Sequence, residues 1–135
     1  MKTNRFLFYT CLVVALGCIG CASYEEPESG LDCGRQFINA TYQGNFKRAG
    51  QLLVATDENK HLLEERIEKD FRSRDAFDKE RLSNASIQIS KVESNGDTLQ
   101  LIHFTNAYNG KPQVLKCVFR QQQWRTDLAY SYPQP

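Results

Sequence analysis

The stretch 85–110, ASIQISKVESNGDTLQLIHFTNAYNG, decides the fold. At its start an alanine and two isoleucines alternate with single polar residues, and a period of two is typical of a β-strand with one buried face. Asn-Gly dipeptides at 95–96 and 109–110 favour tight turns between antiparallel strands. The stretch therefore predicts a hairpin whose second strand covers 98–108 and ends at a further turn.

The sequence that follows extends this hairpin into a meander. An apolar run over 113–120 predicts a third strand, and the glutamines of 121–123 predict a turn. The residues 124–130 predict a fourth strand, which begins with the one tryptophan of the chain. Four antiparallel strands in sequence order are expected.

Helical periodicity precedes the sheet. Apolar and small residues at i, i+4, i+7 and i+8 predict a first helix over 33–44, capped by Asp32 and ended by Gly44. A second, short helix is expected over 46–54. Both would present one apolar face to the sheet.

A third and longer helix is predicted to start at Thr56 or Asp57 and to run to about Leu82. Its outer face carries three oppositely charged i,i+4 pairs, which are typical of a solvated surface, so we assign that face no function. These pairs are Glu65/Lys69, Glu68/Arg72 and Asp70/Arg74. Three N-terminal helices packed on a curved four-stranded antiparallel meander make an α+β fold. We expect Trp124 to be buried against the inner face of the third helix, which carries Leu63, Ile67 and Phe71.

The first residues of the chain follow the pattern of a secretory signal. Residues 1–5 contain two cations and no acid, and 6–16 is an uncharged, largely apolar run of 11 residues. A transmembrane helix needs about 20 apolar residues, so this run is too short to span a bilayer. The pattern predicts a signal peptide over 1–17 and export of the protein.

Two cysteines follow this run, in the sequence ALGCIGC at 15–21. Small and aliphatic residues before a cysteine resemble the lipobox of bacterial lipoproteins. The resemblance implies that the thiol carries diacylglycerol and that the freed amine carries a further chain such as palmitate, which anchors the protein in the outer membrane of the cell envelope. Cys18 fits the pattern best. Cys21 is the alternative, because cleavage there leaves an even number of cysteines.

The segment 18–30 is expected to be a flexible tether between the lipid and the domain. After its cysteines it contains proline, glycine, serine and three glutamates without apolar periodicity. Acidic residues behind a lipidated cysteine also resemble the surface-export signals of Bacteroidota lipoproteins, and a plain solvated linker is the alternative. Residues 31–135 then form a single domain.

Cys33 and Cys117 lie on the apolar faces of the first helix and the third strand. In an oxidising compartment a disulfide between them is predicted, and it would close a long loop. Two buried free thiols are the alternative, because free cysteine is among the most buried residue types.

The segments FINATYQGNFKRA (37–49), DTL (97–99) and QWR (123–125) follow one another in a characteristic order. They resemble the opening helices, the start of a central strand and the closing strand of the nuclear transport factor 2-like superfamily. The nearest resemblance is to the lumazine-binding-like lipoprotein domains of Bacteroidota called domain of unknown function 4878. It implies a cone of sheet closed by helices, a fold that serves isomerases, dehydratases and binding modules. Glutamines at 122–123 stand where the family has a glycine turn, so we expect a longer last hairpin.

Residues suited to catalysis or metal binding are few. The two histidines, His61 and His103, are far apart on different elements, which argues against a metal site, and no glycine-rich loop indicates a cofactor. An acid or base inside the cone would have to be His103, with Asp127 or Tyr108 to orient it or a substrate. The alternative is a half-exposed histidine with a structural hydrogen bond.

The sequence DTL at 97–99 also resembles the O-glycosylation site of exported Bacteroidota proteins, which would place a glycan on Thr98. The same residues are needed where the second strand begins, and this is the alternative explanation.

Composition excludes one class of partner. Without Lys2 and Arg5 the chain has 15 basic and 16 acidic residues, so no basic field attracts nucleic acid. We expect a membrane-tethered, non-catalytic binding module, with a small amphiphile in the cone or an envelope protein on the open sheet face. The alternative is an isomerase- or dehydratase-like enzyme using His103 with Asp127 or Tyr108.

Overall fold

A sheet and a helical layer make up residues 24–131, the part of the chain that this computed structural model describes. The sheet has four antiparallel strands in the order β1-β2-β3-β4, which confirms the predicted meander and the α+β class. A 3₁₀ turn, η2 (Leu128–Tyr130), lies where the sequence predicts that the fourth strand continues. The strands are β1 (Ile87–Asn95), β2 (Leu99–Asn106), β3 (Gln113–Arg120) and β4 (Gln123–Asp127).

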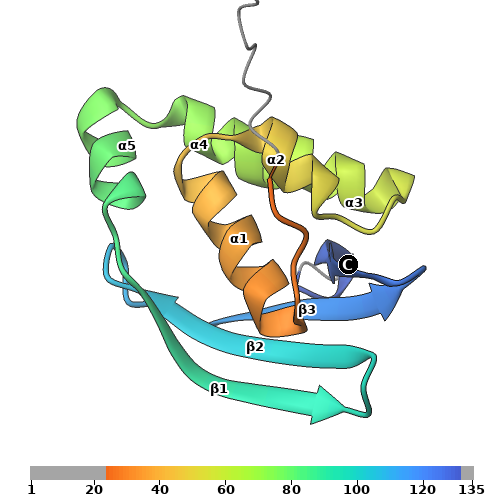
Figure 1. The fold of residues 1–135 in the computed structure, drawn as a ribbon. Coiled ribbons are helices and arrows are strands. Elements are labelled where there is room, and N and C mark those ends of the chain that lie inside the picture. The colour runs from red at the N-terminus through yellow and green to blue at the C-terminus, as the bar shows by residue number, and fades with distance from the viewer. Residues whose placement is uncertain (1–23, 132–135) are drawn as a thin grey trace, which may run out of the picture.

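The helices cover one face of this sheet (Figure 1). They are α1 (Gly30–Tyr42), α2 (Phe46–Gln51), α3 (Asp57–Leu62), the π-helix η1 (Leu63–Glu68), α4 (Lys69–Ser73) and α5 (Ala76–Ser83). The sheet curves around α1, which lies between it and the layer of α2, α3 and α4. α1 contacts β2, β3 and β4, so it joins the sheet to the helical layer. Over the described range no helix has the length and apolar character needed to cross a bilayer.

Turn geometry sets the register of the sheet. Gly96 and Gly110 have φ of 62° and 63°, in the left-handed region that glycine adopts at low cost. The predicted turn at 95–96 is confirmed, but 109–110 lies in a longer connection, 107–112, between β2 and β3. Gln121 and Gln122 have φ of 51° and 61° and join the end of β3 directly to β4. They form a tight two-residue turn, so the expectation of a longer last hairpin is wrong.

The third predicted helix is divided. α3, η1 and α4 follow one another without a break, but Arg74 has ψ of 147° and leaves the helical region. Asp75 then begins α5, and its side chain accepts a hydrogen bond from the Asp78 backbone N–H at 2.8 Å. A side chain that caps a new N-terminus competes with continuation of the previous helix. The predicted single helix to Leu82 is therefore corrected to two segments that meet at Arg74.

Two helix boundaries also differ from the prediction. Ser29, not Asp32, caps α1, because the Ser29 hydroxyl accepts a hydrogen bond from the Asp32 N–H at 3.0 Å. α2 is shorter than predicted, and the residues after it pair with β4. The Thr126 N–H donates to the Leu52 carbonyl at 2.7 Å, and the Val54 N–H donates to the Thr126 carbonyl at 2.9 Å. The segment after α2 thus covers an edge of the sheet that would otherwise be open.

The N-terminal half of α1 packs closely onto the sheet. A β-carbon at Gly34 would lie 2.5 Å from Ile102 Cδ1, so a residue without a side chain allows this approach. Trp124 is 9% exposed, which confirms its predicted burial. Its predicted contact with the third helix is wrong, since the ring lies against Gly30 and 5.4 Å from the Phe119 ring centroid.

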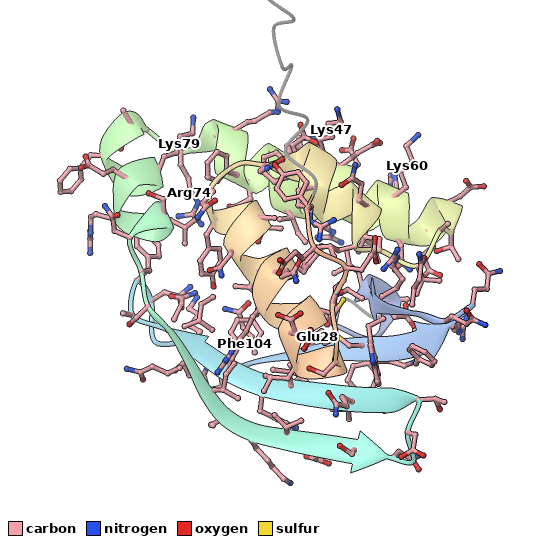
Figure 2. The ribbon with its side chains drawn as sticks, in the orientation of Figure 1. Glu28, Lys47, Lys60, Arg74, Lys79 and Phe104 are labelled. Carbon is pink, nitrogen blue, oxygen red and sulfur yellow. The ribbon has the colours of Figure 1, made fainter. Side chains whose placement is uncertain are left out.

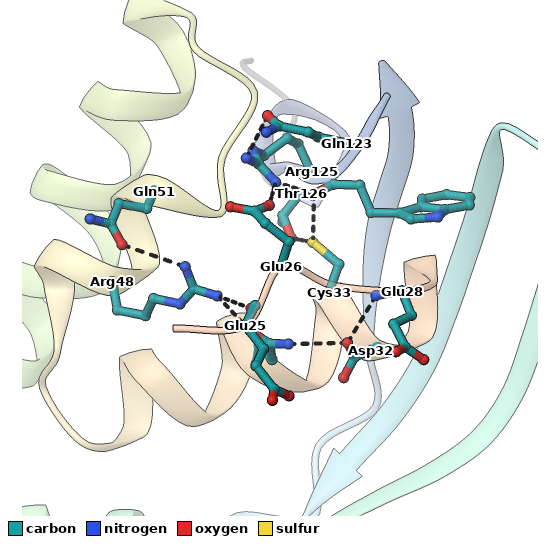
Figure 3. A network of polar contacts seen from close by, with 12 residues as sticks. Glu25, Glu26, Glu28, Asp32, Cys33, Arg48, Gln51, Gln123, Arg125 and Thr126 are labelled. Atoms are coloured by element: carbon teal, nitrogen blue, oxygen red, sulfur yellow. Dashed lines mark hydrogen bonds and ion pairs between the residues drawn. The ribbon is translucent and has the colours of Figure 1, made fainter. Parts of the chain in front are cut away.

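Part of the predicted tether belongs to the folded domain (Figure 3). Arg48 on α2 is buried, donates a hydrogen bond to the Glu25 carbonyl at 2.9 Å and lies 4.8 Å from the Tyr24 ring centroid. Arg125 on β4 forms an ion pair with Glu26 at 2.9 Å. The sequence predicts solvated acidic residues here, but two arginines hold the segment in place. The expectation of a flexible tether is corrected for these described residues.

Candidate functional site

A cavity of about 480 Å³ opens between α1, the junction of α4 with α5, and the ends of β2 and β3. Figure 2 shows Arg74 on its helical side and Phe104 on its sheet side. This volume lies within the range of small-molecule pockets, about 300–1,000 Å³. The apolar lining includes Phe37, Ile38, Ile67, Phe71, Phe104 and Leu115.

Arg74 is fixed at the rim of this cavity. Its Nη2 and Nε atoms donate hydrogen bonds to Asp70 Oδ2 at 2.8 and 3.1 Å, and Nη1 donates to Tyr108 Oη at 3.0 Å. The hydrogen bonds to the Asp70 carboxylate raise the pKa of Arg74. Because the guanidinium is already held on two sides, it loses little conformational freedom when a ligand binds.

The π-helix η1 shapes the wall beside Arg74. Such wide helical turns are rare and occur frequently at functional sites. Here the π-helix places Arg66 and Ile67 on the cavity. The sequence predicts the inward position of Ile67 but gives no indication of the wider turn.

A buried amide joins two walls of the cavity. Asn106 on β2 is 3% exposed, and its Nδ2 donates a hydrogen bond to Tyr42 Oη on α1 at 2.7 Å. Its Oδ1 accepts a hydrogen bond from the Asn109 backbone N–H at 2.9 Å. A buried amide needs such partners. The bonds tie α1 to the turn between β2 and β3 across the cavity mouth.

Basic residues outnumber acidic ones around the cavity. Arg66, Arg74 and Lys111 line it, while Asp70 is the one acid among its described lining residues and is bound to Arg74. The rim therefore has a positive charge in excess. An apolar interior with a cationic rim suits a ligand with an apolar body and an anionic head.

His103 lies on the face of the sheet away from the helices. Its neighbours on β2, Ile102 and Phe104, are buried in the core, and side chains alternate along a strand. His103 Nε2 lies 2.8 Å from Glu93 Oε1 on β1, without hydrogen-bond geometry. A hydrogen bond from Lys91 lowers the pKa of Glu93, so the imidazole lies beside an ionised carboxylate. The half-exposed position agrees with the non-catalytic alternative, but Nε2 does not make the structural hydrogen bond that this alternative includes.

Asp127 and Tyr108 lie apart from His103. Asp127 on β4 forms an ion pair with Lys116 on β3 at 3.2 Å. Tyr108 follows β2, and its hydroxyl is bonded to Arg74. Of the three candidates Tyr108 alone lines the cavity, so the structure does not assemble His103 with Asp127 or Tyr108.

A second polar cluster lies under the N-terminal half of α1. Cys33 and Cys117 are fully buried, and each sulfur lies 3.7 Å from Thr126 Oγ1 on β4. Figure 3 shows Cys33 beside Thr126. A hydrogen bond from Cys117 lowers the pKa of Cys33, and the same contact with burial raises the pKa of Cys117. Both thiols are free here, and the disulfide stays a prediction.

Arg74 is the site residue that sequence analysis misses. The sequence assigns the Asp70–Arg74 pair to a solvated helix face, and the ion pair does form. The helix ends at Arg74, however, and the guanidinium also reaches Tyr108. The overlooked signal is Asp75 followed by Asp78, because a capping acid and a second acid in the first turn mark a helix start.

Several predicted positions stay predictions. Cys18, Cys21 and the signal peptide 1–17 lie outside the described residues. Thr98 is exposed just before β2, and nothing bears on its glycosylation. Across residues 24–131, no group of three or more His, Cys, Asp or Glu side chains could hold a metal ion.

No protein-family model, curated protein or solved structure matches this chain. Function must therefore be inferred from the cavity and from the pattern of the N-terminal sequence.

Proposed function

We propose that this protein is an exported, membrane-tethered and non-catalytic binding module that holds a small anionic amphiphile in the cavity between α1, α4 and α5. The observation that carries the proposal is an apolar cavity of about 480 Å³ with Arg74 fixed at its rim. An empty cavity lowers the stability of a small domain, because the atoms that line it lose contacts. A ligand that fills the cavity restores those contacts.

Recognition is expected to divide between the head and the body of the ligand. A guanidinium has five N–H donors, and Arg74 uses three of them on Asp70 and Tyr108, which leaves two for a carboxylate or phosphate. Lys111 adds positive charge on the same lining. The apolar body of the ligand would pack on Phe104 and its neighbours.

The proposal includes a nuclear transport factor 2-like cone. Its support is the order of the elements together with the curvature of the sheet around α1 (Figure 1). In such a cone the ligand would lie between the concave face of the sheet and the helices.

Tethering rests on the signal pattern and the lipobox resemblance. We propose Cys18 as the acylated residue in the outer membrane, with Cys21 as the alternative. Because Tyr24 lies against Arg48, only the residues between the acylated cysteine and Tyr24 separate the lipid from the domain. At about 3.3–3.6 Å per residue, the distance from the cysteine to Tyr24 is at most about 20 Å for Cys18 or about 10 Å for Cys21. The domain would lie close to the bilayer, with α2 and the adjoining N-terminal segment nearest to it.

The isomerase- or dehydratase-like alternative has less support. Acid–base catalysis needs a titratable group within reach of the substrate. Asp70 in the cavity is bound to Arg74, and His103 and Asp127 do not line the cavity. We therefore propose binding without catalysis.

Calorimetric titration of residues 22–135 with octanoate and octanol tests the proposal. We expect octanoate to bind at least tenfold more tightly than octanol, because charge-assisted hydrogen bonds contribute about 1.5–3 kcal/mol and 1.4 kcal/mol is a factor of ten. Arg74→Gln should reduce octanoate affinity to that of octanol.

Arg72→Gln is the matched control. Arg72 lies near the end of α4, two residues before Arg74, and likewise pairs with an acid four residues earlier, but its side chain is 72% exposed and does not line the cavity. Octanoate affinity should be unchanged in this variant. Equal affinity for both ligands, or an equal loss in both variants, would contradict recognition of an anion by Arg74.

A further inference from the structure

The thiol cluster has no part in the proposed ligand site. None of Cys33, Cys117 and Thr126 lines the cavity. They lie on three different elements, α1, β3 and β4, and all three are fully buried. The cluster therefore needs an explanation of its own.

The two sulfurs are brought together by the close approach of α1. Each lies 3.7 Å from Thr126 Oγ1, so they are separated by no more than twice that distance. A β-carbon at Gly34 would lie 3.6 Å from Cys117 Sγ, which shows that the helix backbone beside Cys33 runs directly over Cys117.

The hydroxyl of Thr126, on β4, contacts both thiols. The two sulfurs are the hydrogen-bond partners of this hydroxyl in the described chain, and thiols are weak partners. A buried hydroxyl with only weak partners contributes little to holding α1 on the sheet. The position is suited to a stronger link between the two elements.

We propose that Cys33 and Cys117 are a disulfide site, and that the bridge forms while the chain folds and then clamps α1 to β3. The inference rests on the proposed export only for the supply of oxidant in the cell. It does not depend on ligand binding.

The reaction needs an oxidant of one chemical class, a disulfide. A thiolate of one cysteine attacks that disulfide and forms a mixed disulfide, and the second cysteine then displaces the remaining thiol. Two S–H bonds are lost and one S–S bond forms, while two electrons and two protons pass to the oxidant as two thiols. A disulfide-carrying oxidoreductase or oxidised glutathione balances the step.

Burial sets the timing of the reaction. Both cysteines are 0% exposed, so an oxidant does not reach them in the closed domain. Oxidation must therefore precede closure of α1 on the sheet or wait for its opening. This predicts fast bridging during refolding and slow bridging afterwards.

Refolding of the reduced, denatured full chain in a glutathione redox buffer tests the site. After acid quenching and denaturation, free thiols are alkylated and tryptic peptides are mapped. We expect Cys117, in the peptide 117–120, to be unlabelled and linked to the peptide 6–35, in which Cys33 also escapes labelling while Cys11, Cys18 and Cys21 are labelled. When the oxidant is added only after refolding under reductant, the bridge should form at least tenfold more slowly. Full labelling of both cysteines, or a link from Cys33 to Cys21, would overturn the proposal.

Two variants separate the bridge from simple packing. Cys33→Ala should leave Cys117 fully labelled. Thr126→Val, which keeps the shape and removes the hydroxyl, should still form the bridge. Loss of the bridge in Thr126→Val with the fold intact would show that the hydroxyl, not the proximity of the two thiols, decides the chemistry, and would contradict the proposal.

The same peptide mapping on protein isolated from cells tests the disulfide and the export of the protein separately. A cleaved signal with both thiols labelled overturns the bridge and supports export. An uncleaved signal, with a bridge that forms in the glutathione refolding, contradicts export and supports the bridge.

Discussion

The two ends of α1 meet the same sheet in different ways. At the N-terminal end, Gly34 brings the helix within contact of Ile102, and Cys33 is fully buried. At the C-terminal end, Phe37 and Tyr42 line a cavity of about 480 Å³. One helix therefore closes the core at one end and leaves it hollow at the other.

Side-chain size along the helix accounts for the difference. The first turns carry glycines and a cysteine, which permit close approach, while the later turns carry phenylalanine, isoleucine and tyrosine. Bulky side chains hold the helix off the curved sheet, and a protein interior tolerates such a gap only at a cost in stability. The comparison indicates that the N-terminal end supplies stability and the C-terminal end supplies the site.

We expect the greatest loss of stability at the closed end, the N-terminal end of α1. Trp124→Ala should lower the free energy of unfolding by about 3–5 kcal/mol, because a large buried ring is lost and a cavity is left. Small domains have about 5–15 kcal/mol in total, so the variant should be close to unfolding at 25 °C. Urea denaturation followed by circular dichroism measures the change.

Phe77→Ala is the control for this prediction. Phe77 is 68% exposed, so its removal should change the free energy of unfolding by less than about 0.5 kcal/mol. Equal stability of the two variants would place Trp124 outside the core and remove the distinction between the two ends.

Gly34→Ala should give the next largest effect. The new β-carbon would lie 2.5 Å from Ile102 Cδ1, and Ile102 is fully buried, so α1 must shift away from the sheet. Overpacking lowers the free energy of unfolding by about 1–3 kcal/mol, and the higher helix propensity of alanine offsets up to about 1 kcal/mol of that loss. A net loss of about 1–2 kcal/mol is expected in the same urea experiment.

Gly50→Ala is the matched control for this prediction. On α2 the nearest atom to the new β-carbon is Leu63 Cδ2 at 3.8 Å, so the helix gains propensity without a clash. Stability should stay the same or rise by up to about 1 kcal/mol. If both glycine variants lost stability equally, close approach at Gly34 would not explain the closed end.

The smallest effect on stability is expected at the open end. Arg74→Gln removes an ion pair with Asp70, whose side chain is 60% exposed, and a hydrogen bond to Tyr108. Solvent screening limits the loss to about 1 kcal/mol or less. A thermal melt of this variant should therefore resemble that of the wild type, although its affinity for octanoate falls to that for octanol. A loss as large as that of Trp124→Ala would make Arg74 a core residue, not a site residue.

The sheet could be predicted from sequence because its signals are local. Alternation in β1 and β2 and the Asn-Gly turns each depend on neighbouring residues, and the third strand begins and ends where predicted. The glutamine turn is also predicted, and only the length of the last hairpin is wrong, because Gln121 and Gln122 adopt left-handed φ without glycine.

The site depended on contacts between distant residues. The break at Arg74 is stabilised by Tyr108, 34 positions later, and the N-terminal segment is held by Arg48 and Arg125. Charge periodicity identifies Asp70–Arg74 as a pair but not the element that the arginine faces. The thiol pair was predicted from apolar faces alone, and the structure adds the proximity of the two sulfurs.

Ligand binding in the cavity is tested most directly by the map of amide chemical-shift changes when octanoate is added to the protein labelled with ¹⁵N. We expect the largest changes to cluster at the open end, around 66–74 and 104–109, and Cys33, Cys117 and Trp124 to change little. Changes confined to the closed end or to the outer face of the sheet, or no saturable changes at all, would show that the cavity does not bind the anion.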